Sequence, residues 1–277
     1  MAVRETYSNV STVRRIVDNL MWMSALLFVC LAITGILRPK RIGFACNDIS
    51  IQHPFVGDTI SEGVLLCSLL FGSALTIFIV EAIHHYPISK NLNQQCYNHW
   101  LMVLGDFLLG FVYVFFVTEL LKAVVGELRP HFLASCQPDW SKINCSEGFV
   151  IEYNCTRREQ YRLENIDIYK SFPSGHSSLS LYSFVFISLY AQVRLQWTSK
   201  SHVLKLVLQL VFLSWALVCS LTRISDRRHF WWDVLVGCLI GIIGGILTVR
   251  CFLRNSLFCM VKVVAGDESA SSTKKDN

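Results

Sequence analysis

Apolar residues dominate this chain in long runs that are separated by shorter polar segments. Six of the runs are long enough to cross the hydrocarbon core of a bilayer as helices of about twenty residues. They cover residues 20–37, 63–83, 100–121, 177–195, 203–221 and 232–253. The pattern predicts an all-α membrane protein with six transmembrane helices, and it disfavours a soluble domain with a single buried core.

The first apolar run is predicted to be a retained helix rather than a cleaved signal peptide. It is longer than the apolar region of a signal peptide, and the basic segment GILRPKRIGF follows it in place of a small-residue cleavage site. The predicted organisation is a cytosolic N-terminal segment 1–19, a six-span domain 20–253 and a cytosolic tail 254–277. The tail is short and polar, which favours disorder.

Six spans would place both termini on one side of the membrane and the segments 38–62, 122–176 and 222–231 on the other. The basic residues are divided almost evenly between the two sides, so the positive-inside rule does not orient the chain. Glycosylation sequons at Asn144 and Asn154 both lie in the longest of these segments. They predict that this face is extracellular or lumenal.

Composition supports a membrane protein, and the positions of the cysteines support its orientation. Of the 277 residues, 53% are hydrophobic and only 16% are charged, which is unusual for a soluble domain. Cys46, Cys136, Cys145 and Cys155 all lie in the segments assigned to the outer face. Disulfides persist there, although the sequence does not reveal how these cysteines pair.

Three polar clusters lie at the ends of predicted spans. Ionisable residues at a membrane edge are costly, and they usually have a functional reason. The third span ends with TELLKAVVGELRPHFL, the fourth begins with SFPSGHSSLS, and the sixth begins with LTRISDRRHFWWDV. Because the third span runs outward while the fourth and sixth start outside, all three clusters are predicted to meet at the same face.

The first cluster offers two cations. Lys122 and Arg129 are seven residues apart, which is about two helical turns, so both can point to one side before Pro130 ends the helix. An ammonium group and a planar guanidinium together are suited to holding a phosphate. The alternative is a pair of cations whose stems lie along the apolar surface while their charged ends reach water.

The second cluster precedes an apolar run. Gly175 would let backbone N–H groups approach a ligand closely, and the N-terminus of the following helix favours an anion. His176 follows directly. The alternative is an ordinary N-cap, formed by Ser174 or Ser177, beside a histidine without a functional role.

The third cluster pairs a histidine with a carboxylate. His229 and Asp233 are four residues apart, close enough on a helix for the carboxylate to orient the imidazole and stabilise its cation. Arg223 adds a third cation. The alternative is a surface ladder of ion pairs that includes Arg227 and Arg228.

Together the clusters place two histidines opposite several cations and backbone amides. This combination suggests a nucleophile and a general acid for phosphoryl transfer, with the cations stabilising the charge on the phosphoryl oxygens. The sequence has no carboxylate cluster and no Cys/His spacing typical of a metal site. We therefore expect neither a metal nor another cofactor, and no nucleic-acid partner.

The clusters resemble the signature of the type 2 phosphatidate phosphatase (PAP2) superfamily, which also contains the vanadium haloperoxidases. That signature is Lys-x6-Arg-Pro, then Pro-Ser-Gly-His, then Ser-Arg-x5-His-x3-Asp. The matching residues are Lys122, Arg129, Pro130, Pro173, Ser174, Gly175, His176, Arg223, His229 and Asp233. Only Thr222 departs from the signature, since it stands where serine is usual, and it retains a hydroxyl. The segments RPHFLASCQPDWSKINCSEGF and RIGFACNDISIQHPF are similar to eukaryotic lipid phosphate phosphatases, and the resemblance covers most of 20–250.

The resemblance implies a haloperoxidase-like helical bundle and a catalytic role for the domain 20–253. His229 would form a phosphohistidine, Asp233 would hold its tautomer, and His176 would protonate the leaving oxygen. The residues that would bind phosphate are Lys122, Arg129, Ser174, Gly175 and Arg223. Such enzymes act without Mg²⁺ on phosphatidate, lysophosphatidate, sphingosine 1-phosphate and ceramide 1-phosphate at the extracellular or lumenal face, which here is expected to be that of the plasma membrane.

Two other functions fit the sequence less well. A catalytically inactive relative would lack the catalytic residues, which are all present here. An anion or lipid transporter would place its charges nearer the membrane midplane and often contains repeated halves. Gly237, Gly241 and Gly245 form small-xxx-small steps that favour close packing inside the bundle, while a homo-oligomer remains open.

Overall fold

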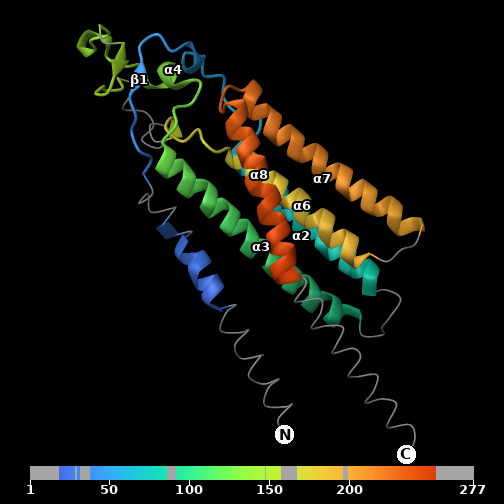
Figure 1. The fold of residues 1–277 in the computed structure, drawn as a ribbon. Coiled ribbons are helices and arrows are strands. Elements are labelled where there is room, and N and C mark those ends of the chain that lie inside the picture. The colour runs from blue at the N-terminus through green and yellow to red at the C-terminus, as the bar shows by residue number, and fades with distance from the viewer. Residues whose placement is uncertain are drawn as a thin grey trace, which may run out of the picture.

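Long helices make up most of the structure, which is a computed structural model (Figure 1). The described residues are 19–28, 30–31, 38–85, 92–146, 148–156, 167–195 and 199–253. The predicted tail 254–277 and nearly all of the predicted N-terminal segment 1–19 therefore lie outside the described residues. The helices are Asn19–Phe28, α2 (Glu62–His85), α3 (Leu92–Val125), α6 (Gly175–Arg194), α7 (Ser199–Ser225) and α8 (Trp231–Thr248). A π-helical turn, Val249–Leu253, continues α8.

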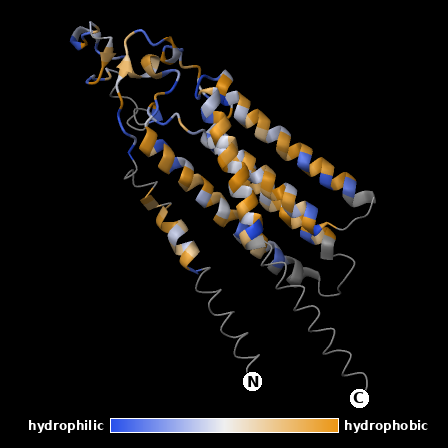
Figure 2. Cartoon of the chain, viewed as in Figure 1, coloured by the Kyte–Doolittle hydropathy of each residue, from blue (hydrophilic) through white to orange (hydrophobic). Residues whose placement is uncertain are grey.

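Four helical segments are long and apolar enough to cross a membrane (Figure 2). They are Glu62–Ile83, His99–Val125, His202–Ser225 and Trp231–Cys251. The structure therefore supports a membrane protein with four of the six predicted spans. The first predicted span, 20–37, is described only over 19–28 and 30–31, where it is helical.

The fourth predicted span corresponds to α6, which is long enough at 20 residues but rich in serine. It packs against α2, α3, α7 and α8, and most of its side chains are buried. These serines face other helices instead of lipid, so α6 does not need an apolar surface. Their hydroxyls bond to backbone carbonyls of α6 itself, as those of Ser180 and Ser183 do. The low hydropathy of α6 thus follows from its central position.

Glycines hold α8 tightly against α6. A Cβ atom added at Gly237 or Gly241 would clash with the carbonyl oxygen of Ser174 or Ser178, and one added at Gly245 would clash with Val185. The small-xxx-small steps of the sequence therefore pack within the bundle, as predicted. This packing brings the first turn of α8, which contains Asp233, beside the first turn of α6.

The segments 38–57 and 126–156 form a small folded unit at one end of the bundle, which we call the loop cap (Figure 1). It contains α4 (Phe132–Cys136) and an antiparallel pair of short strands, β1 (Phe44–Ala45) and β2 (Phe149–Val150). Two 3-10 turns, Ile49–Ile51 and Trp140–Lys142, complete it. The sequence predicts an all-α fold, so these two strands, each only two residues long, were not expected.

All four cysteines of the loop cap are paired. Cys46 is bonded to Cys145, and Cys136 is bonded to Cys155. The side chains of the two sequon asparagines, Asn144 and Asn154, are exposed on the same unit. Both asparagines are therefore sterically open to a glycan.

Candidate active site

The ends of α3, α6, α7 and α8 converge beneath the loop cap, and the three polar clusters meet there. The peptide N–H of Ser174 donates to the carbonyl of Asp233 at 3.0 Å, which joins α6 to α8. Arg129, which follows α3, donates to the carbonyl of Arg228 at 3.2 Å. The structure thus brings all the predicted catalytic and phosphate-binding residues to one end of the bundle.

His229 is held through one ring nitrogen. Its Nδ1 lies 2.7 Å from the carbonyl oxygen of Ser171, and the side chain is almost completely buried. Because a carbonyl can only accept, Nδ1 carries the hydrogen and the lone pair of the neutral ring is on Nε2. Burial, followed by the charges of Arg129 and Lys122, lowers the pKa of His229 well below its ordinary value. The imidazole is therefore neutral at neutral pH, as a nucleophile requires.

Asp233 lies farther from the imidazole than the sequence analysis expected. Its Oδ2 is 3.6 Å from His229 Nδ1, which is too long for a hydrogen bond. The same oxygen accepts from the hydroxyl of Ser171 at 2.6 Å and from the peptide N–H of Phe230 at 2.9 Å. Asp233 thus fixes Ser171 and the start of α8, while the Ser171 carbonyl holds the tautomer.

Glu127 adds a second carboxyl group that the sequence analysis missed. Its carbonyl accepts from the peptide N–H of Ser171 at 3.0 Å, and its side chain accepts from Trp232 Nε1 at 2.9 Å. Burial, and after it the charge of Asp233, raise the pKa of Glu127 to about 7. Among the described residues, nothing donates to Asp233 Oδ1, which is buried. A protonated Glu127 could donate to the Asp233 carboxylate, which it contacts.

Stability is expected to depend on the protonation of Glu127. Since its pKa is raised by folding, its contribution is present below the unfolded pKa of about 4.3 and is lost as pH rises through about 7. Glu127→Gln imitates the protonated form, so its melting temperature in detergent should fall less than that of the wild type between about pH 5 and pH 8. Glu152→Gln, at an exposed position of the loop cap, should follow the wild type. Parallel curves for all three proteins would contradict this prediction.

Lys122 lies between the site and a partly buried carboxylate, that of Glu119. Its Nζ lies 2.7 Å from Glu119 Oε1, and the other oxygen of Glu119 lies 3.1 Å from Lys170 Nζ. A Cβ atom added at Gly175 would lie 3.3 Å from Lys122 Nζ, so the glycine gives the ammonium group room beside the first turn of α6. Lys170 is a further cation that the sequence analysis did not assign.

Ser174 is the N-cap of α6, which was the alternative interpretation of that cluster. Its Oγ accepts from the peptide N–H of Ser177 at 3.5 Å and from the Ser177 hydroxyl at 3.1 Å. The cap and an anion site are compatible, because the first peptide N–H groups of a helix have no partners within the helix.

Arg129 and Arg228 share one carboxylate. Arg129 binds the side chain and the carbonyl of Asp167, and Arg228 NH2 lies 3.0 Å from Asp167 Oδ2. Burial alone would raise the pKa of Asp167, but the two guanidinium groups outweigh burial and the pKa is lowered. Arg228 also donates to His131 Nε2 at 3.2 Å. Arg228 is therefore part of the site instead of a surface ladder.

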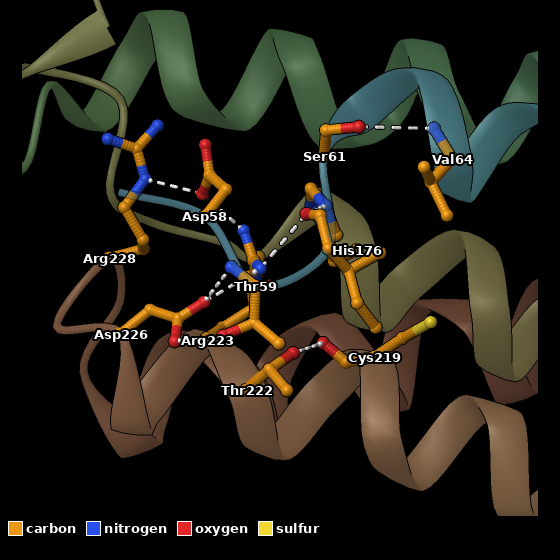
Figure 3. Close-up of polar contacts among 12 residues, drawn as sticks. Asp58, Thr59, Ser61, Val64, His176, Cys219, Thr222, Arg223, Asp226 and Arg228 are labelled. Carbon is orange, nitrogen blue, oxygen red and sulfur yellow. Dashed lines mark hydrogen bonds and ion pairs between the residues drawn. The ribbon is translucent and has the colours of Figure 1, made fainter. Parts of the chain in front are cut away.

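His176 and Arg223 meet a segment in which the sequence analysis assigned no site residue. His176 Nε2 lies 3.0 Å from the carbonyl oxygen of Ile60, and Arg223 NH1 lies 2.7 Å from Asp58 Oδ1 (Figure 3). Thr222, the one departure from the signature, donates its hydroxyl to the carbonyl of Val218 at 2.8 Å. The Thr222 hydroxyl therefore forms a hydrogen bond within α7.

Comparison with known proteins identifies the family. The sequence profile of the PAP2 superfamily matches residues 103–257, a segment that contains all three clusters and more than half of the chain. The chain belongs to the PAP2 superfamily.

Three relatives place it more closely within the PAP2 superfamily. Phospholipid phosphatase 2 of Bos taurus is 36% identical over 228 residues, which cover 80% of this chain and 76% of the relative. Phospholipid phosphatase 2 of Homo sapiens is 35% identical, with 80% and 77% covered. Phospholipid phosphatase 1 of Rattus norvegicus is 36% identical, with 76% and 75% covered. No solved structure gives a significant match. These similarities confirm the resemblance carried by the three clusters.

Proposed function

We propose that this PAP2-superfamily protein is an integral membrane enzyme that hydrolyses phosphate monoesters of lipids. The observation that carries the proposal is the arrangement of His176 and His229. Each imidazole has one nitrogen bound to a backbone carbonyl, which leaves the other nitrogen available among three cations, Lys122, Arg129 and Arg223. The names of the phospholipid phosphatase relatives support the same activity.

The first half of the reaction would transfer the phosphoryl group to the enzyme. His229 Nε2 attacks phosphorus, and a P–N bond forms while the P–O bond to the lipid breaks. The electron pair of that bond goes to the leaving oxygen, which takes a proton from Nδ1 of a protonated His176. The lipid alcohol leaves, and a phosphohistidine remains at His229.

The second half would release phosphate. A water molecule attacks phosphorus and gives one proton to His176 Nδ1, while the P–N bond breaks and its electrons return to His229 Nε2. Inorganic phosphate leaves, and both histidines are back in their starting states. Asp233, at 3.6 Å from the ring, would stabilise the positive charge that His229 carries as a phosphohistidine.

The residues proposed to bind the phosphoryl oxygens are Lys122, Arg129, Ser174, Gly175 and Arg223. The cations match the charge on those oxygens in the transition state, and the N-terminus of α6 adds unpaired peptide N–H groups. Within the described ranges, no group of three or more His, Cys, Asp or Glu side chains could hold a metal ion. We propose that the cations take the part that Mg²⁺ plays in other phosphatases.

The proposed substrates are phosphatidate, lysophosphatidate, sphingosine 1-phosphate and ceramide 1-phosphate. A site at helix ends lies at the depth of lipid headgroups, so a substrate could react without leaving the bilayer. We propose six spans and an active site on the extracellular or lumenal face, in the plasma membrane. The exposed Asn144 and Asn154 and the two disulfides of the loop cap support this orientation.

A phosphate-release assay tests this function. Purified protein in detergent is given each of the four lipid phosphates, with and without EDTA, and inorganic phosphate is measured. Release from at least one lipid, unchanged by EDTA, is expected. Absence of release from every lipid would contradict the proposed function, and loss of release with EDTA would contradict its metal independence.

A further inference from the structure

The segment Asp58–Ile60, which we call the strap, connects the loop cap to α2. It runs between the first turn of α6, where His176 lies, and the last turn of α7, where Arg223 lies (Figure 3). The three signature clusters do not include it. Each of its residues nevertheless contacts the site or a neighbour of the site.

Thr59 anchors the strap to the end of α7. Its peptide N–H donates to Asp226 Oδ2 at 2.8 Å, and its hydroxyl donates to Asp226 Oδ1 at 2.7 Å. Asp226 Oδ2 is also 3.1 Å from Arg223 NH2. One buried carboxylate therefore holds both the strap and the arginine, which fixes their relative positions.

Asp58 and Ile60 accept the other hydrogen bonds of the Arg223 guanidinium. Asp58 Oδ1 accepts from NH1 at 2.7 Å, and the Ile60 carbonyl accepts from NH2 at 3.0 Å. Arg223 is only 1% exposed, and its Nε is buried without a hydrogen-bond partner among the described residues. A buried donor without a partner is destabilising, so a phosphate oxygen that accepts from Nε would be stabilising.

The Ile60 carbonyl also sets the state of His176. It lies 3.0 Å from Nε2, and since it can only accept, it assigns a hydrogen to Nε2 and leaves Nδ1 for the substrate. A hydrogen bond to the charged form of a group favours that form. Burial and then the charge of Arg223 lower the pKa of His176, and the hydrogen bond to this carbonyl opposes that change. The carbonyl therefore favours the imidazolium, which is the form a general acid needs before it gives up its proton.

Four charged or titratable groups surround His176 from the packed elements. They are Arg223 on α7, Lys122 on α3, His229 before α8 and Asp58 on the strap. Asp58 is the only negative charge among these four. It also forms an ion pair with Arg228 Nε at 3.0 Å, so it offsets the positive charge of both Arg223 and Arg228.

We propose that the strap is a positioning element of the active site, in which Asp58 and Thr59 hold the Ile60 carbonyl against His176 and hold Arg223 in place for phosphate. This inference rests on the proposed phosphatase function. Asp58 and Thr59 act through Ile60 and Arg223, so they are positioning residues. The chemical step would still belong to His176 and His229.

The test compares two substrates in one sample. Asp58→Asn should reduce hydrolysis of a lipid phosphate by about 10-fold or more, because its alkoxide leaving group needs the proton of His176. Hydrolysis of an aryl phosphate, whose phenolate leaves without a proton, should fall much less. The alkaline limb of the pH–rate profile should also move to lower pH, because a negative charge that stabilises the imidazolium is removed.

The ratio of the two activities and the position of the pH profile do not depend on the amount of folded protein, so partial loss of folded protein cannot produce these changes. Thr59→Val removes one of the two hydrogen bonds from Thr59 to Asp226. The substrate ratio and the pH profile should change in the same direction as for Asp58→Asn, but by a smaller amount. Asp48→Asn is the matched control, since the Asp48 side chain caps a 3-10 turn of the loop cap and Ser50 is its only hydrogen-bond partner among the described residues.

Several results would overturn the inference. Equal losses on the two substrates with an unmoved pH profile would mean that the strap does not act on His176, which contradicts the inference. A gain in activity for Asp58→Asn would mean that Asp58 competes with phosphate for Arg223. Absence of activity in the wild-type protein would contradict the proposed function itself, and it is measured first.

Discussion

Replacement of His229 by asparagine is expected to abolish phosphate release while the fold is retained. Asparagine has a nitrogen close to the position of Nδ1, so it can still donate to the Ser171 carbonyl that His229 contacts at 2.7 Å. It has nothing at the position of Nε2, the proposed nucleophile. Since nucleophile and acid act as a unit, we expect a loss of at least about 10³-fold.

The measurement is a quench experiment with a lipid phosphate labelled in the phosphoryl group. The wild-type protein should carry acid-labile label on histidine, and the His229→Asn variant should carry none. His53→Asn is the matched control, because the His53 imidazole makes no polar contact with other described residues and should be dispensable. Label on the His229→Asn protein would assign the nucleophile to another residue.

The helices could be predicted from the sequence because the bilayer imposes a length on them. α2, α3, α7 and α8 each contain an apolar run that matches the hydrocarbon thickness. Three of these helices, α2, α3 and α7, extend beyond the predicted runs at both ends. For example, α3 covers Leu92–Val125, whereas the sequence predicted 100–121. Beyond each apolar run the helix continues through polar residues. Hydropathy therefore does not show where such a helix begins or ends.

The active site could be predicted where chemistry resides in side chains at fixed spacing. The three clusters are local, and each was recognisable within a window of fewer than twenty residues. Topology then placed them at one face. Arg223, His229 and Asp233 lie within eleven positions of one another, so their proximity needed no knowledge of the fold.

The supporting contacts could not be predicted because they use backbone groups from distant segments. The Ile60 carbonyl and His176 are 116 positions apart, and Asp58 and Arg223 are 165 apart. Any residue could supply a carbonyl, so nothing at Ile60 or Ser171 marks its role in the sequence. Glu127 lies within the first cluster, yet only the fold shows that it approaches Asp233.

The structure of the loop cap could not be predicted for the same reason, because it depends on contacts between distant segments. Its four cysteines were expected in segments where disulfides persist, and they are paired, but which cysteines pair depends on which segments approach. Phe44 and Val150, which pair across the short sheet, are far apart in the chain. This pairing brings Cys46 to Cys145. Strands of two residues have too few positions for an alternating pattern, so hydropathy could not have revealed them.

Replacement of His176 by glutamine is expected to separate general acid catalysis from nucleophilic attack. The amide nitrogen of glutamine can reach the position of Nε2 and donate to the Ile60 carbonyl, which His176 contacts at 3.0 Å. It leaves no proton donor at the position of Nδ1. Release of the lipid alcohol should therefore fall by about 10²–10⁴-fold.

An aryl phosphate should behave differently with the His176→Gln protein. Its phenolate can leave unprotonated, so the first turnover should proceed and give a burst of phenol equal to the amount of enzyme. Hydrolysis of the phosphohistidine should then be slow, because His176 is also the proposed base for water. Labelled phosphate should accumulate on His229, which is the opposite of the result expected for His229→Asn. A double variant should be no less active than His229→Asn alone, because residues that act as one unit have non-additive effects. Equal losses on lipid and aryl phosphates, without a burst, would show that His176 is not the acid.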